Sequence, residues 1–124
     1  MNSAESIAVA DIESLLALLD QFDLWVKWWV RCEVGPDWIG AGRSIQFYLG
    51  ERPLADTAFH TYLKSELVNV LGIPERCEDA LIFGEGDIFR KRTVLEVEYE
   101  WWEAVPYMYP REVQAGKAVL VAIS

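Results

Sequence analysis

Residues 24–34 read LWVKWWVRCEV, and their pattern decides the fold class. Every even position is apolar, from Leu24 to Val34, whereas the odd positions include Lys27 and Arg31. Because side chains alternate between the two faces of a strand, this period of two predicts a β-strand with one buried face. A Gly-Pro-Asp sequence follows directly and predicts a turn.

Two other stretches have the helical period instead. We expect helices over residues 4–22 and 56–71, with Ser3 and Asp56 as their N-terminal caps. Gly72 stands where a glycine commonly ends a helix. The apolar residues that define the two helical stripes are Ile12, Leu15, Leu16, Leu19 and Phe22 in the first helix, and Phe59, Leu63, Leu67 and Val70 in the second.

Further strands are predicted over residues 43–49, 88–102 and 118–123, again from alternation. Residues 75–83 fit a short helix, and the glycine-rich residues 84–87 fit a turn. The chain is therefore predicted to be a single α+β domain over residues 1–124. Its expected order is α-β-β-α-β-β, with an antiparallel sheet of about four strands and both helices packed on one face. The order hints at internal duplication, although no residue-level repeat supports it.

The charge of the chain restricts its partners. Twenty acidic residues against eleven basic ones give a net charge of −9 over 124 residues. Such a surface repels phosphate backbones and anionic membranes, so direct binding to nucleic acid or membrane is not expected. An acidic surface suits a basic protein partner, because opposite charges accelerate the encounter. Acidity that serves solubility alone is the competing interpretation.

Several functional classes lack their motifs. Two cysteines and one histidine are too few for a disulfide scaffold or a zinc site made of Cys and His, and no phosphate-binding glycine loop occurs. Asp87 and Glu96 have a spacing found in restriction-type nucleases, but Glu98 stands where that pattern needs a lysine. We predict no catalytic residue, metal or cofactor. Without a signal peptide or an apolar span, a cytoplasmic protein is expected.

The sharpest local feature is the acidic ladder formed by Glu96, Glu98 and Glu100. On a strand these carboxylates point to the same side, about 7 Å apart. Such a row is either a solvated surface or a contact for a basic partner. A divalent-metal site is the weaker alternative.

Tryptophan is the second feature, with six residues of which four form adjacent pairs. Trp28 and Trp101 share the parity of the apolar positions and are assigned to the core. Trp29 and Trp102 then belong to the polar face. Exposed aromatic side chains are enriched at interface hot spots, so this pair is the candidate apolar anchor of a binding surface.

The leading hypothesis is a non-enzymatic binding protein, or inhibitor, that masks a basic surface of a protein partner. Its binding residues are Trp29, Trp102 and the acidic ladder. Carboxylates on a strand can imitate phosphates, so a nucleic-acid-binding protein or a toxin is a plausible target. In composition alone, the chain resembles toxin-neutralising immunity proteins and phage-encoded inhibitors of host defences, and this likeness transfers no residue.

Two alternatives stay open. The first is a small-molecule or sugar-binding domain, with or without enzymatic activity, whose pocket is lined by Trp38, Tyr48, Tyr107 and Tyr109. The second is an obligate homo-oligomer, such as a homodimer, that buries its aromatic face against a second copy. A deep apolar cleft favours the pocket, whereas a flat acidic and aromatic face favours the protein partner.

Overall fold

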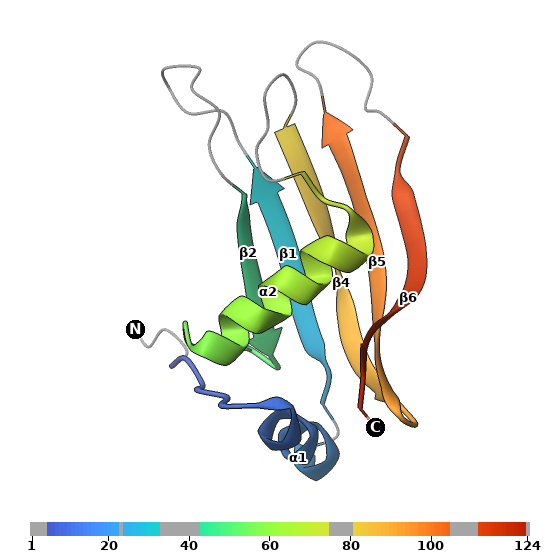
Figure 1. Cartoon of the computed structure of the whole chain (residues 1–124). Coiled ribbons are helices and arrows are strands. Elements are labelled where there is room, and N and C mark those ends of the chain that lie inside the picture. The colour runs from blue at the N-terminus through green and yellow to red at the C-terminus, as the bar shows by residue number, and fades with distance from the viewer. Residues whose placement is uncertain (1–4, 23, 33–42, 75–80, 105–111, 124) are drawn as a thin grey trace.

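A six-stranded antiparallel sheet is the centre of the computed structural model, which describes residues 5–22, 24–32, 43–74, 81–104 and 112–123 (Figure 1). The strand order is β3-β2-β1-β4-β5-β6, and all neighbouring strands are antiparallel. The elements are α1 (Ile12–Phe22), β1 (Val26–Cys32), β2 (Ser44–Leu49), β3 (Arg52–Pro53), α2 (Ala58–Leu71), β4 (Leu81–Lys91), β5 (Val94–Ala104) and β6 (Gln114–Ala122).

The predicted α+β class with an antiparallel sheet and two helices is confirmed, but the strand number and the element order were wrong. Strand β3 is only two residues long, so it leaves no alternation to detect. Strand β4 includes residues 84–87, which the glycines had suggested to be a turn. The actual β4–β5 turn contains Arg92, a non-glycine residue with φ of 57°, so the usual glycine signal is missing there.

Gly84 and Gly86 lie inside β4 because larger residues need their space. A Cβ atom built on Gly84 would lie 2.6 Å from Trp101 Cβ. One built on Gly86 would overlap the Glu98 carbonyl and lie 2.9 Å from Trp28 Nε1. Glycine in a strand often marks such a close approach, so these two glycines accommodate the core tryptophans rather than a turn.

The alternation predicted for β1 is confirmed, because Val26, Trp28, Val30 and Cys32 are all buried. Their side chains belong to the core, together with apolar residues of β2, β4 and β5 and the buried stripes of both helices. Helix α2 runs diagonally across this face, and α1 packs near the end at which β4 and β5 are joined (Figure 1). We call this side of the sheet the helix-covered face.

The helix starts differ from those predicted. Helix α1 begins only at Ile12, where the Asp11 carboxylate accepts a hydrogen bond from the Ser14 N–H at 2.8 Å, and this bond lowers the pKa of Asp11. The residues before it are extended, and Ile7 forms a parallel bridge with Leu54. Helix α2 is capped by Thr57 instead of Asp56. The predicted Ser3 cap lies outside the described residues.

The end of α2 agrees with the prediction, because Gly72 adopts the left-handed conformation and donates its N–H to the Val68 carbonyl. Each helix precedes three strands, so the fold consists of two αβββ units joined by the pairing of β1 with β4. Among the described residues, neither helix has the length and apolarity needed to cross a membrane.

Candidate binding face

The side of the sheet opposite the helices is the candidate binding face. Both described helices contribute their buried residues to the core on the other side, where α2 crosses the sheet (Figure 1), and we call this opposite side the uncovered face. Strand alternation places on it the residues between the core positions, such as Lys27 and Trp29 in β1 and Tyr48 in β2. The acidic ladder of β5 also faces this side, opposite in parity to the buried Leu95 and Val97.

Four carboxylates gather at the centre of this face, and we call them the acidic quartet: Glu85, Asp87, Glu98 and Glu100. The β4–β5 register pairs Glu85 with Glu100 and Asp87 with Glu98. Side chains that are directly opposite each other in an antiparallel pair have Cβ atoms about 5 Å apart, and like charges there are destabilising. The quartet therefore places two repulsive pairs side by side.

The two pairs differ in their neighbours along the next strands. Lys27 lies opposite Asp87, and Lys117 lies opposite Glu98, so the row of Asp87 and Glu98 is flanked by cations. The row of Glu85 and Glu100 is flanked by Trp29 and Ala115, which carry no charge.

No member of the quartet forms an ion pair within 4.0 Å with any residue that the structure describes. The pair of Glu85 and Glu100, with no cation in its row, is therefore the less compensated one.

A hollow of about 670 Å³ lies over the quartet. Its lining includes all four carboxylates, the two flanking lysines, and Trp29 and Tyr48. This volume is within the range of small-ligand sites, which are usually apolar. Here four acidic side chains and two lysines lie among the lining residues, so the hollow carries a local excess of negative charge that favours a cationic group.

The predicted aromatic anchors border the acidic quartet. Trp29 is half-buried, with the Arg31 guanidinium 5.2 Å from its ring centre and its Nε1 donating to Tyr48 Oη at 3.4 Å. Trp102 is also half-buried and has a tilted ring contact with Phe83, at 6.2 Å between ring centres. These contacts fix the two tryptophans next to the row of Glu85 and Glu100.

Some of the other predicted site residues line the hollow, and others lie outside it. Glu98 and Glu100 are exposed and line the hollow, whereas Glu96 lies outside it. The Glu96 side chain is largely buried and lies 3.9 Å from Lys91 Nζ. Tyr48 belongs to the hollow instead of to a separate pocket. Its proposed pocket partners Trp38, Tyr107 and Tyr109 lie outside the described residues.

Sequence reasoning did not place Glu85 and Asp87 on the binding face, and it considered Asp87 only for the rejected nuclease pattern. They were assigned to a turn because each follows a glycine. The signal that could have identified them is the alternation of Glu85 and Asp87 with Gly84, Gly86 and Ile88, which continues the polar–apolar pattern of a strand.

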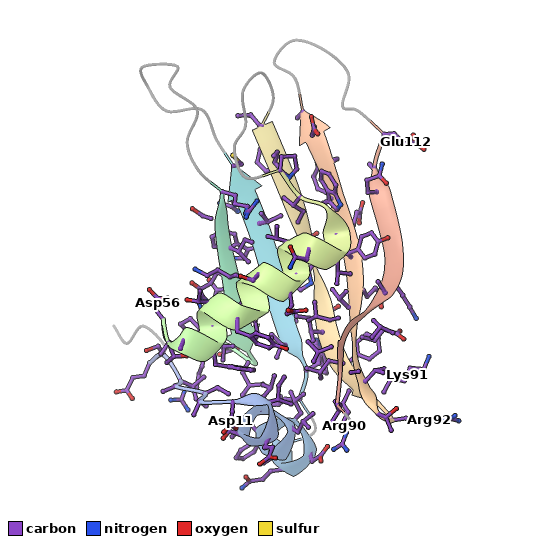
Figure 2. All side chains as sticks on the ribbon, in the orientation of Figure 1. Asp11, Asp56, Arg90, Lys91, Arg92 and Glu112 are labelled. Carbon is purple, nitrogen blue, oxygen red and sulfur yellow. The ribbon has the colours of Figure 1, made fainter. Side chains whose placement is uncertain are left out.

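The basic residues Arg90, Lys91 and Arg92 precede the acidic ladder, and they form local contacts near the β4–β5 turn. Arg90 Nη1 lies 2.8 Å from Asp20 Oδ2 of α1, and Lys91 contacts Glu96. Figure 2 shows Arg90, Lys91 and Arg92 gathered where β4 turns into β5. Within the described part of the chain, no group of three His, Cys, Asp or Glu side chains is arranged to hold a metal ion.

The comparisons with known proteins give no relative from which a role could be transferred. No family model, curated protein or solved structure matches the chain. The arrangement of charges and aromatic rings on the uncovered face is therefore the basis on which its function is argued.

Proposed function

We propose that this chain is a non-enzymatic, cytoplasmic binding protein whose uncovered face docks on a basic surface of a protein partner. The observation that carries the proposal is the acidic quartet, in particular the uncompensated pair of Glu85 and Glu100. Opposed like charges lower the stability of a sheet, and such violations of folding rules are expected at functional sites. A cation from a partner would remove the repulsion.

The surroundings of the quartet support a protein partner. Trp29 and Trp102 offer fixed aromatic surface beside the charges, and aromatic residues dominate the energetics of many interfaces. Lys27, Arg31 and Lys117 lie on the same face, so the complementary surface would have a basic centre with acidic or apolar neighbours. Targets that normally bind nucleic acid, including nuclease toxins, have basic surfaces of this kind.

A double variant that removes two negative charges, Glu85→Gln with Glu100→Gln, tests the proposal. The matched control, Glu13→Gln with Glu51→Gln, removes the same charge from exposed positions outside the quartet. Partners captured by the wild-type chain from cell extract are identified, and their association rates are measured by surface plasmon resonance over a range of salt concentrations. We expect the quartet variant to associate about tenfold more slowly, with a flatter salt dependence, because electrostatic steering is reduced.

The control variant separates local from global charge. If the association rate falls equally in both variants, net charge alone governs binding and the proposed docking face is wrong. If the association rate falls in neither variant, the quartet takes no part in recognition.

A second candidate function is the binding of a small ligand, such as a sugar or a small cation, in the hollow over the quartet. Its volume of about 670 Å³ favours this candidate. Thermal-shift measurements with oligosaccharides and polyamines separate it from the first. A saturable rise in melting temperature would support the small ligand if the double variant Glu85→Gln with Glu100→Gln abolishes that rise.

The homo-oligomer alternative is tested separately, by light scattering after size-exclusion chromatography.

A further inference from the structure

A second concave site lies on the other side of the molecule, between α2 and the outer edge of β2. It is a groove of about 520 Å³ that shares no lining residue with the hollow over the quartet. Strand β3 pairs only with Tyr48 and Leu49, so residues 44–46 have no described strand along their outer edge. The groove is therefore open beside the first half of β2.

His60 is part of the groove lining and is 96% buried, with only 4% of its surface exposed. Neither ring nitrogen has a hydrogen-bond partner among the described residues. The Asp56 carboxylate lies 3.5 Å from Nδ1, and the ring makes an edge contact with Phe47. A buried imidazole without partners is costly, so a ligand that supplies one would be favoured.

The charge of the groove is opposite to that of the chain. Its lining holds two cations, Arg43 and Lys64, against the single carboxylate of Asp56, in a chain with a net charge of −9. The Asp56 side chain is 86% exposed and projects at the start of α2, where water screens its charge (Figure 2). The groove thus has a local excess of positive charge.

The donors in the groove are held in position by the fold. Arg43 Nη1 donates to the Ile73 carbonyl at 3.0 Å, which fixes the guanidinium beside the end of α2. His60 and Lys64 are one helical turn apart, as are the hydroxyl-bearing Thr61 and Ser65, and all four line the groove. The set combines two cations, an imidazole and the Ser65 hydroxyl, which are groups that recognise oxyanions, whereas the Thr61 hydroxyl donates to the Thr57 carbonyl at 3.4 Å.

We propose that this groove binds an oxyanion, either a carboxylate or a phosphate group, through Arg43 and Lys64 with His60 as an additional donor. The bound anion would supply the partner that the imidazole lacks. It would also offset the nearby cations, so His60 would be protonated more readily in the complex than in the unbound protein.

The test uses His60 as its reporter, because it is the single histidine of the chain. Its ring carbon–proton signals are followed by NMR at constant pH during titrations with inorganic phosphate and with acetate, with chloride maintaining the ionic strength. We expect saturable shifts toward the protonated imidazole. The preferred oxyanion is identified by whether phosphate, acetate or both produce these saturable shifts. If neither anion produces them, the proposal is overturned.

Variants assign the response to the groove. Lys64→Gln is expected to weaken binding about tenfold, the loss expected when one charge-assisted hydrogen bond is removed, and adding Arg43→Gln should abolish it. The matched control, Arg52→Gln with Arg92→Gln, removes two exposed cations outside the groove and should bind as the wild type does. Lys64→Gln leaves the Arg43 contact with Ile73 intact, so its effect does not come from loss of that contact. Equal weakening of oxyanion binding in Lys64→Gln and in the control would overturn the proposal.

Discussion

His60 is a buried residue of α2, and its ring makes an edge contact with Phe47 of β2. Burial lowers the pKa of His60 below its usual value of 6.5, and the nearby Lys64 ammonium lowers it further, while Asp56 opposes both effects. The imidazole is therefore mainly neutral in the folded protein at neutral pH. The titration of His60 should therefore alter stability above the pH range of the carboxylates.

The first prediction concerns the pH dependence of stability. As the pH falls through about 6.5, the unfolded chain takes up a proton on His60 before the folded chain does. The free energy of unfolding should therefore be constant above this pH and decline below it, until the lowered pKa of the folded state is reached. Urea unfolding between about pH 8 and pH 5.5 measures the decline outside the main carboxylate range.

The variant His60→Phe isolates this contribution. It should lose the decline, because phenylalanine takes up no proton, and gain about 1 kcal/mol at low pH, because two buried nitrogens without hydrogen-bond partners are removed while an aromatic ring is kept. If His60→Phe shows the same decline as the wild type, another group is responsible.

A second prediction at the residue scale concerns Gly86. A methyl group there would overlap the Glu98 carbonyl and press on the Trp28 indole, so Gly86→Ala should destabilise the fold by at least about 3 kcal/mol. The control is Gly116→Ala on β6, where the nearest atom is the hydroxyl of Tyr99 at 3.2 Å, at the end of a side chain. Similar urea midpoints for the two variants would show that Gly86 is not a packing requirement.

At the scale of elements, the β4–β5 hairpin brings the four carboxylates of the quartet together. Their repulsion should be measurable in the isolated protein. Replacing Glu85 and Glu100 by glutamine removes one opposed like-charge pair and should raise the free energy of unfolding by about 0.5–1 kcal/mol. The control Glu13→Gln with Glu51→Gln should not raise it, since neither residue has a like charge opposite it in a described strand pair, and Glu13 lies in the first turn of α1, where the helix dipole favours its charge.

Together with the binding experiment, this stability measurement separates a structural role from a functional one. A variant that is more stable yet associates more slowly has lost a feature that serves recognition at the expense of the fold. A loss of stability would instead show that the quartet supports the sheet.

The elements also show what the sequence could predict. The buried face of β1 and the end of α2 at Gly72 follow from local patterns, and both were predicted correctly. The last residues of β4 fall within the strand predicted over 88–102, but residues 84–87 were missed because the reason for their glycines lies in other strands, where Trp28 and Trp101 need the space. Local signals cannot distinguish a glycine required by a turn from one required by a distant side chain.

At the scale of the whole molecule, the same limit applies to the candidate site. The acidic ladder was evident in the sequence, but its partners Glu85 and Asp87 were not, because the repulsive pairs exist only in the β4–β5 register. The groove was missed for a similar reason. Arg43, Asp56 and Lys64 are dispersed in the sequence, and only the packing of α2 beside β2 gathers them around His60.

The strand order has a kinetic consequence. Strands β1 to β3 and strands β4 to β6 each follow one another in the sheet as they do in the chain, so each set can form from near neighbours. The β1–β4 pairing instead joins residues that are 50 positions apart at Cys32 and Ile82 and 62 positions apart at Val26 and Ile88. Closing so long a segment costs entropy before any contact is gained, and this step should therefore set the folding rate. The β1–β4 pairing between the two halves would therefore form after the strands within each half have paired.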